Sequence, residues 1–490
     1  MMKSISVEQE LMLINGEGKE SINLAVYPVE TPAKRGTVIA EVPRASAEDV
    51  DIAVKAAHEA FKSWREVPSH ERGRLLYKIA DAVEEQIDDI ARTIAAETGN
   101  AIGTQSREEV KIAVEVFRYF AGIASELKGS MLPIDDNLMA YTQREPYGVV
   151  GAIVPWNTPF LLSTNKIAPA IITGNTIVLK AAKEAPLGVL KLAKICARYL
   201  PKGVVNVLTG FGAELGDALA SHPLVQKLSF TGSTEVGKTI MHKAADRIIP
   251  VTLELGGKNP QIVFPDANSE KVIEGVISAM RFSRQGQSCS SGTRLYIHTS
   301  IFDSFVERIL NKLGELKIGN PLDEESDIGC VISEKQFKSI CRYIEEGIND
   351  QDVELLMGGL PPKEGPLAEG YYLQPTVFYV KNHNPRLARE EIFGPVLTIF
   401  KWEDEAEVIQ AANNSSYGLT AFVWTNDIKT ALRTANKIES GYIQVNRGGG
   451  QMAGLPYGGY KQSGLGHEFS LDGMLNSYTQ IKSILINLND

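Results

Sequence analysis

The chain has 490 residues, of which 43% are hydrophobic and 22% charged, which is typical of a globular protein with a sizeable core. This length predicts two or three domains rather than one. The 50 basic and 60 acidic residues give a net charge of −10, which disfavours nonspecific contact with nucleic acid, and no basic block reverses that expectation.

The first part of the chain predicts two helices. In "SAEDVDIAVKAAHEAFKSW", Ser46 can cap the helix, Asp49 can complete a capping box, and apolar residues recur along one face. A second helix is predicted from about Ser106, in "SREEVKIAVEVFRYFAGIASEL". The "NLMAYTQREPYG" that follows is expected to be extended.

From about residue 147, short apolar runs alternate with helical patterns. The runs are "YGVVGAIV", "NTIVLK", "VVNVL", "KLSFT" and "PVTLEL". A second series begins near residue 267 and contains "TRLYIH", "VLTIF", "TAFVWT" and "YIQVN". Such alternation indicates parallel sheets covered by helices on both faces, so we expect an α/β protein with two doubly wound parallel sheets. The final "NSYTQIKSILINL" predicts a terminal strand that pairs within the subunit or across an interface.

Three predicted strands end in residues that could bind a ligand, because ligands of parallel sheets lie at the carboxyl ends of the strands. "VPWNTPF" holds the Asn157 amide in a loop stiffened by two prolines. "SFTGSTEVGK" places Ser233 at a helix start, where free N–H groups favour phosphate. "LELGGK" places Glu254 at the third end. Taken singly, the Asn157 segment is equally explained as a turn and the Ser233 segment as a helix cap, whereas an acid at the position of Glu254 is usually solvated or salt-bridged.

Cys289 lies among small and polar residues in "RQGQSCSSGTR", which is not typical of a packing cysteine. A thiolate attacks carbonyls, an amide can hold an oxyanion, and a carboxylate can activate water, so Cys289, Asn157 and Glu254 are candidates for one catalytic cleft. No histidine is placed to pair with the thiol as in a protease. Cys196, by contrast, lies on an apolar helix face and is expected in the core.

The four cysteines form no C-x-x-C pair and have no histidine at ligand spacing. This argues against a disulfide scaffold and against structural zinc, so we expect no metal site and a cytoplasmic location. The first 20 residues lack the apolar core of a signal peptide, and the apolar runs are far shorter than the ~20 residues of a membrane helix.

Taken in order, the motifs resemble those of the NAD(P)-dependent aldehyde dehydrogenases over nearly the whole chain. The matching stretches are "VPWNTPF", "GNTIVLKAAKEAP", "SFTGSTEVGK", "LELGGKNP", "GQSCSSGTRLY", "EEIFGPV", "NNSSYGLTAFVWT", "SGYIQVN" and "PYGGYKQSGLG". The resemblance implies that Cys289 adds to the aldehyde, giving a thiohemiacetal that passes hydride to the nicotinamide and becomes a thioester. Glu254 would activate the water that releases the acid. Asn157 and the backbone N–H of Cys289 would form the oxyanion hole.

The resemblance also implies a cofactor site. Lys180 matches a ribose contact, Ser233 a pyrophosphate contact, and Glu391 and Phe393 residues at the nicotinamide end, with Gln336 nearby. Further residues expected along the cofactor groove are Ile153, Pro155, Trp156, Gly212, Gly216, Phe230, Gly232 and Leu255.

The family architecture implies a cofactor-binding domain at 1–122 and 146–256 and a catalytic domain at 257–455. Residues 123–145 and 456–490 would form an oligomerisation extension with the C-terminal segment. A homodimer or homotetramer is therefore expected.

One departure from the family pattern concerns the cofactor. Three residues after Lys180, where NAD-preferring relatives commonly carry a glutamate, this chain has Lys183. An ammonium attracts a 2′-phosphate, so Lys183 favours NADP over NAD. The alternative is that Lys183 points into solvent, Glu184 partly substitutes, and NAD serves.

A second departure concerns the aldehyde. Thr158, Ser288 and Ser290 make the surroundings of the nucleophile small and polar, which favours a hydroxylated or aromatic aldehyde over a long alkyl one. Asn446 lies where the substrate loop "NRGGGQMAGLPYGG" begins, although its glycines are also explained as a flexible linker.

Two rival functions remain open at this point. A CoA-acylating aldehyde dehydrogenase would pass the thioester to a thiol instead of water, but such enzymes generally lack the carboxylate at the position of Glu254. A noncatalytic protein retaining the fold would have no need of Cys289, Glu254 and Asn157 together.

Overall fold

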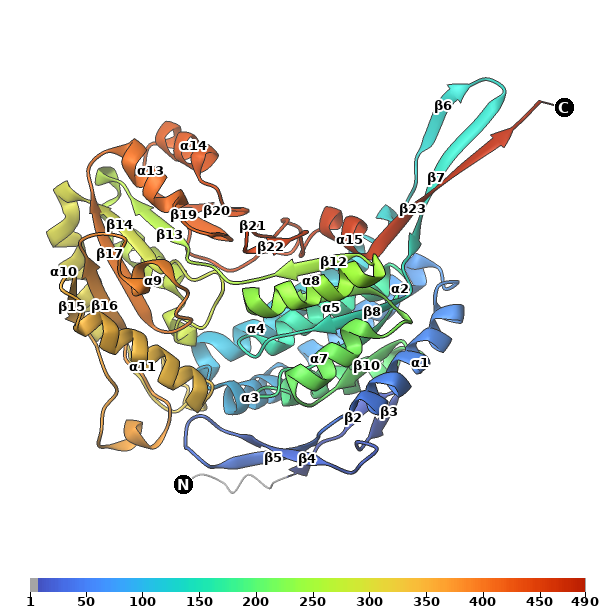
Figure 1. Cartoon of the computed structure of the whole chain (residues 1–490), viewed down its shortest axis with the longest axis horizontal. Helices are drawn as coiled ribbons and strands as arrows, with labels where there is room; N and C mark the ends of the chain where they lie inside the picture. Colours follow the sequence, from blue (N-terminus) through green and yellow to red (C-terminus); the bar gives the residue numbers. More distant parts are fainter. Residues whose placement is uncertain (1–7, 490) are drawn as a thin grey trace.

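The structure is a computed structural model and describes residues 8–489 of the chain. Two large sheets lie in separate lobes, and a three-stranded arm projects from the body next to the first sheet (Figure 1). This confirms the predicted fold class, an α/β protein with two doubly wound sheets and a β extension.

The first sheet has eight strands in the order β22-β12-β11-β8-β9-β10-β2-β3. Its five central strands, β12 to β10 in that order, run parallel, whereas β2, β3 and β22 pair antiparallel with their neighbours. The central strands are the five apolar runs that the sequence predicted. Their bounds are β2 Met12–Ile14, β3 Glu17–Lys19, β8 Val149–Ile153, β9 Thr176–Lys180, β10 Val205–Leu208, β11 Val225–Thr231, β12 Val251–Glu254 and β22 Gly464–Leu465.

Helices cover both faces of this sheet and bury separate apolar clusters. One face carries α1 Ala47–Trp64, α7 Gly212–Ser221 and α8 Thr234–Arg247. The other carries α2 Ser69–Glu84, α3 Ile87–Thr98, α4 Arg107–Gly122, α5 Pro159–Ile172 and α6 Leu187–Tyr199.

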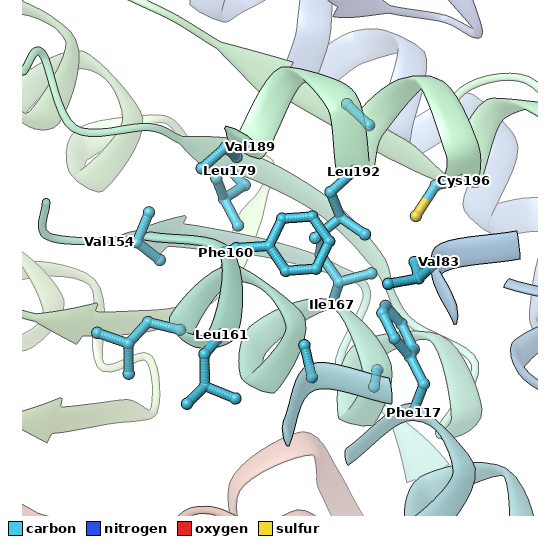
Figure 2. Close-up of a cluster of buried hydrophobic side chains, with 14 of the residues drawn as sticks. Val83, Phe117, Val154, Phe160, Leu161, Ile167, Leu179, Val189, Leu192 and Cys196 are labelled. Carbon is cyan, nitrogen blue, oxygen red and sulfur yellow. The ribbon is translucent and has the colours of Figure 1, made fainter. Parts of the chain in front are cut away.

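The helix predictions near the start are confirmed for α1 and α4. Ser46 and Asp49 form the predicted capping box, and α4 begins at Arg107, next to the predicted start. The two helices between them, α2 and α3, were not predicted. On the α4 side, Phe160 and Ile167 of α5 meet Leu192 and Cys196 of α6 (Figure 2), so Cys196 is a core residue as expected.

The second sheet has seven strands in the order β15-β16-β17-β14-β13-β19-β20, parallel except for β15 at its edge. The strands are β13 Pro260–Val263, β14 Arg294–His298, β15 Val353–Met357, β16 Thr376–Val380, β17 Val396–Trp402, β19 Thr420–Trp424 and β20 Tyr442–Val445. One face is covered by α9 Glu270–Met280 and α10 Phe302–Gly314. The other is covered by α11 Glu334–Ile348, α12 Arg386–Arg389 and α13 Glu405–Asn413, while α14 Ile428–Lys437 contacts β19 and β20.

The arm consists of β6 Met131–Asp135, β7 Leu138–Pro146 and β23 Thr479–Asn487, paired antiparallel with β7 in the middle. It confirms the predicted terminal strand, which pairs within the subunit after α15 Leu471–Tyr478. Apolar side chains on the arm are exposed, among them Met131, Ile134, Ile481 and Leu485.

The remaining elements are short. A small sheet joins β1 Glu8–Gln9, β4 Val26–Glu30 and β5 Val38–Pro43, and a two-stranded ladder joins β18 Tyr417–Gly418 and β21 Tyr460–Lys461. A π-helix lies at Ile102–Ser106, and short 3-10 helices lie at Ala124–Glu126, Pro265–Ala267, Phe282–Arg284, Thr299–Ile301 and Pro366–Glu369.

The strands of the first sheet other than β22 lie between residues 12 and 254, and those of the second between 260 and 445. The predicted domain boundaries near residues 122, 146, 256 and 455 stay a prediction. In the part of the chain that the structure describes, no helix has both the length and the apolar character needed to cross a membrane.

Candidate active site

The site lies where three parallel strands of the first sheet end together. β8 ends at Ile153, β11 at Thr231 and β12 at Glu254, and in the ladders Phe230 pairs with Ile153 and Thr231 with Glu254. The loop after β8 carries Asn157. Cys289 comes from the other lobe, in the loop between the turn Phe282–Arg284 and β14.

Two adjoining cavities open at these strand ends. The inner cleft has a volume of about 380 Å³ and is lined by Asn157, Glu254 and Cys289 together. The outer groove has a volume of about 570 Å³ and runs between α7, α8 and the strand ends. The two share Pro155, Trp156, Thr231 and Gly232 in their walls, so they adjoin each other.

The Cys289 thiol is partly exposed in this cleft. Its sulfur lies 3.9 Å from the hydroxyl oxygen of Tyr457. Burial, followed by the charge of Glu391, raises the pKa of the thiol to about 11, while Tyr457 and Arg284 act in the opposite direction. The thiol is therefore mostly protonated at neutral pH in this state of the protein.

Glu254 is buried, and neither of its carboxylate oxygens has a hydrogen-bond partner among residues 8–489. Burial and the like charge of Glu468 raise the pKa of Glu254 well above its ordinary value, and Lys166 opposes the shift. A buried carboxylate with free oxygens and a raised pKa is a stronger base than an exposed one, so once ionised it can take a proton from water.

Behind Glu254 lies a buried ion pair that the sequence analysis missed. Lys166 Nζ and Glu468 pair with almost no exposure to solvent, and Asn165 Nδ2 donates to Glu468 Oε2 at 2.6 Å. The signal in the sequence was a lysine inside the mostly apolar helix "PFLLSTNKIAPAII", because a buried charge requires a partner.

Asn157 is held rigidly in the cleft wall. Its backbone carbonyl oxygen accepts a hydrogen bond of 3.0 Å from Asn100 Nδ2. Its side-chain Nδ2 donates to the backbone carbonyl of Gln287, also at 3.0 Å. An amide nitrogen carries two N–H groups, so one remains for a ligand. The backbone N–H of Cys289 donates to no acceptor among residues 8–489, which leaves a second free donor on a residue that lines the same cleft.

The groove offers a cation and small residues where a dinucleotide would bind. Lys180 is buried in the groove wall and has no hydrogen bond or ion pair within residues 8–489. Burial lowers the pKa of its ammonium group to about 8, while the negative charge of Glu184 acts in the opposite direction. A Cβ at Gly212 would lie 3.9 Å from Lys180 Nζ, and Gly216 also lines the groove. Ser233 caps α8, accepting a hydrogen bond from the N–H of Val236. These residues fit a dinucleotide with its phosphates near α8.

Lys183 is exposed at the same groove. Its Nζ lies 5.0 Å from the centroid of the Phe211 ring, and Glu184 beside it is half-buried. Because Lys183 lines the groove, its side chain is within reach of a ligand there.

At the other end of the space, Glu391 and Phe393 line the inner cleft. Glu391 Oε1 accepts a hydrogen bond of 2.9 Å from the Gly257 N–H, and burial raises the pKa of this carboxyl to about 7. Phe393 packs edge-on against Trp156, with 5.3 Å between ring centroids, and Gln336 Nε2 donates to its carbonyl at 2.9 Å. That hydrogen bond holds Phe393 in a left-handed backbone conformation, with φ of 54°.

The remaining cofactor candidates also lie in these walls. Ile153, Pro155, Phe230 and Gly232 line the groove, and Leu255 lines the cleft.

The residues expected to contact the substrate are less closely grouped than those expected to contact the cofactor. Thr158 is buried at the start of α5. The hydroxyls of Ser288 and Ser290 bond to each other at 3.0 Å. The Asn446 amide donates to the Thr425 carbonyl at 2.7 Å and accepts from the Thr425 N–H at 3.0 Å, so it serves its own loop. A substrate contact from Asn446 stays a prediction.

Among residues 8–489 there is no group of three or more histidine, cysteine or acidic side chains that could hold a metal ion.

Comparison with known proteins places the chain in a family. The aldehyde dehydrogenase family matches residues 20–484. An aldehyde dehydrogenase of Vibrio cholerae serotype O1 is 41% identical over 468 residues, which cover 94% of this chain and 92% of that protein. An aldehyde dehydrogenase from Bacillus cereus, solved as an NAD+ complex, is 39% identical with a TM-score of 0.95 and coverage of 98% and 97% of the two chains. A structure described as an E. coli NADP-dependent enzyme is 35% identical with a TM-score of 0.94 and covers 98% of both chains.

Fold, site and similarity together define the class of this protein as an enzyme, an oxidoreductase built on two α/β sheets. The chain belongs to the aldehyde dehydrogenase family.

Proposed function

We propose that this protein oxidises an aldehyde to a carboxylic acid, with Cys289 as nucleophile, Glu254 as the base that activates water, and Asn157 with the Cys289 N–H as the oxyanion hole. The observation that carries the proposal is the presence of these three side chains in one cleft that adjoins the groove beside Lys180. The residues of the groove fit NAD or NADP.

In this mechanism Cys289 loses its proton and attacks the carbonyl carbon, and the developing oxyanion accepts the free N–H of Asn157 and the backbone N–H of Cys289. The nicotinamide, when bound, supplies the acceptor for the hydride, leaving an acyl group on the sulfur. Glu254 then takes a proton from water, which attacks the thioester and releases the acid. The glutamate can do so because its two oxygens are unpaired within residues 8–489.

The Glu254 carboxylate supports hydrolysis of the thioester rather than transfer of its acyl group to coenzyme A. For the cofactor, we propose that NADP is used at least as well as NAD, because Lys183 lies at the groove where NAD-preferring relatives commonly carry a glutamate. Lys180 would contact the ribose, Ser233 the pyrophosphate, and Glu391, Phe393 and Gln336 would define the nicotinamide end.

The polar surroundings of the nucleophile support a hydroxylated or aromatic aldehyde over a long alkyl one. Thr158, the residue after Asn157, adds a short polar side chain at the start of α5. The exposed apolar surface of the arm supports assembly with a second copy of the chain, as a dimer or a tetramer.

The test is product analysis with a panel of aldehydes, NAD or NADP, and no coenzyme A. We expect acid and reduced cofactor in equal amounts, no product with Cys289→Ala, and a burst of reduced cofactor followed by slow turnover with Glu254→Gln. Acid formation that survives in Cys289→Ala, or that requires coenzyme A, would refute this mechanism.

A further inference from the structure

The outer groove extends along two helices that the mechanism above does not use. Each helix contributes four residues at the spacing i, i+3, i+4 and i+7, which is one face of a helix. They are Ala213, Gly216, Asp217 and Ala220 of α7 and Val236, Thr239, Ile240 and Lys243 of α8. Apart from Asp217 and Lys243 they are small or apolar, and the Thr239 hydroxyl donates to the Glu235 carbonyl of its own helix. Val236 is 47% exposed. An apolar slot with a few polar groups is typical of a ligand site.

An ion pair joins the two helices across this slot. Lys243 Nζ lies 2.8 Å from Asp217 Oδ1, and both residues line the groove. Lys243 lies ten residues after Ser233 in α8, which is about 15 Å along the helix. The side chains are 34% and 58% exposed, and an exposed ion pair of this kind adds little to stability. An ammonium has three N–H donors and a carboxylate about four acceptor sites, so the pair can also bind a ligand.

The proposed function fixes which part of the cofactor reaches this slot. The nicotinamide end must lie in the cleft of Cys289, with the pyrophosphate at Ser233. Lys180 and Lys183, which line the groove, are assigned to the adenosine ribose and its 2′-phosphate. The base attached to that ribose is therefore left for the space between α7 and α8. Adenine presents an N7 acceptor beside a 6-amino donor, which an ammonium and a carboxylate complement.

We propose that Asp217 and Lys243 select the base of the cofactor, with the 6-amino group of adenine donating to Asp217 and Lys243 donating to N7. The inference rests on the proposed function and adds two specificity-determining residues to it. It applies to NAD and NADP alike, because both carry adenine. A 6-oxopurine such as hypoxanthine has a carbonyl oxygen in place of the amino group, so it would place an acceptor against the Asp217 carboxylate.

The test measures binding of two reduced dinucleotides without aldehyde, by nicotinamide fluorescence: NADH and its hypoxanthine analogue, deamino-NADH. The readout is the ratio of the Kd for deamino-NADH to the Kd for NADH. We expect a wild-type ratio of about 10 to 100, as for the loss of a hydrogen bond to a charged group. Asp217→Asn should bring the ratio close to one, because an amide can accept from a 6-amino group and donate to a 6-oxo group. Lys243→Met should weaken both ligands by a similar factor and keep the ratio, because both bases carry N7.

Asp89→Asn is the matched control, because it makes the same change at an exposed carboxylate whose ion pair with Lys191 joins α3 to α6 outside the groove. It should keep the wild-type ratio. A wild-type ratio near one, a ratio unchanged by Asp217→Asn, or an equal fall in Asp89→Asn would overturn the inference. Unchanged binding of both ligands to Lys243→Met would overturn the contact between Lys243 and N7. A Tm lowered by Asp217→Asn at an unchanged ratio would make the ion pair only a link between helices, which also overturns the inference.

A second measurement removes the nicotinamide from the comparison. ADP and inosine diphosphate differ only in the base, and each should displace NADH from the protein. We expect ADP to do so at a concentration about 10- to 100-fold lower in the wild type and at a similar concentration in Asp217→Asn. Equal displacement in the wild type would overturn the inference. A wild-type protein that binds neither reduced dinucleotide would instead overturn the proposed function, so the two failures are distinguishable.

Discussion

The hydroxyl oxygen of Tyr457 lies 3.9 Å from the sulfur of Cys289, although the two residues are 168 positions apart in the chain. Tyr457 is fixed there by edge-on packing against Tyr442, with 5.3 Å between ring centroids, and against Phe469, with 6.0 Å. Its hydrogen bond lowers the pKa of a thiol that burial raises to about 11. The tyrosine therefore favours the reactive thiolate in an otherwise unfavourable site.

Removing this hydroxyl should make the thiol less reactive. We expect Tyr457→Phe to slow alkylation of Cys289 by iodoacetamide at pH 9 by about 2- to 10-fold, because one hydrogen bond to the thiolate is lost. In both proteins the rate should keep rising with pH through 9 and 10, since the thiol ionises only near pH 11. Tyr442→Phe is the control and should alkylate like wild type. A plateau near pH 8, or equal rates for Tyr457→Phe and wild type, would contradict this prediction.

The charge of Glu468 should set the pH dependence of acid release. Because the pKa of Glu254 is raised by burial and then by Glu468, the rate of thioester hydrolysis should increase as pH rises through that raised pKa, where the active carboxylate forms. Glu468→Gln removes the like charge and leaves Lys166 unopposed, so the rise should move to lower pH. The measurement is single-turnover acid release after the burst of reduced cofactor.

Glu254→Gln provides the reference for that experiment. Its hydrolysis rate should be slower by about 10²- to 10⁴-fold and should show no rise over the same pH range, because no base remains. A shift of the Glu468→Gln profile to higher pH would contradict the prediction, because it would mean that Glu468 lowers the pKa of Glu254 rather than raising it.

Lys183 should influence the choice between the two cofactors. We expect Lys183→Glu to lower the ratio of kcat/KM with NADP to kcat/KM with NAD by about 10- to 100-fold, because a charge-assisted contact to the 2′-phosphate becomes a repulsion. Lys202→Glu makes the same change of charge at an exposed lysine that pairs with Glu17 outside the groove, and should leave the ratio unaltered. If both variants keep the wild-type ratio, Lys183 points into solvent.

The arm should be required for assembly. Ile481 and Leu485 are 61% and 62% exposed on β23, and both point to one face of the strand because they are four residues apart. Replacing both by aspartate should shift the mass in sedimentation velocity to that of a single chain, since buried charge at an apolar interface is costly. Asn487→Asp adds a charge to the same strand without removing apolar surface and should keep the wild-type mass. Unchanged assembly of the double variant would place the subunit interface elsewhere.

Much of the fold could be predicted from local patterns. The five apolar runs after residue 147 form β8 to β12, and Ser46 with Asp49 forms a capping box. Both could be predicted because burial on both faces of a strand and helix capping depend on residues close together in the sequence. α2 and α3 were not singled out, because much of what buries them is supplied by other elements, α2 packing against α4 and α5 and α3 against α4 and α6.

The residues of the candidate site were likewise predicted only where a local motif identifies them. Asn157, Glu254 and Cys289 were found because each occurs in a recognisable local motif, and all three line one cleft. Asn446 was nominated in the same manner, yet its amide is occupied by Thr425. Lys166, Glu468 and Tyr457 were not predicted, because their importance lies in partners far away in the chain.

The sequence by itself determined the alternation of strands and helices, the family, and the residue types available for chemistry. Only the tertiary structure decided which polar groups meet, since Asn165 and Lys166 reach Glu468 across 303 and 302 positions of the chain. The periodicity of the sequence predicts whether a side chain is buried. It does not predict which residue forms a hydrogen bond or ion pair with that side chain. That partner is fixed by how the sheets pack, since a buried charge is stable only where the fold supplies its complement.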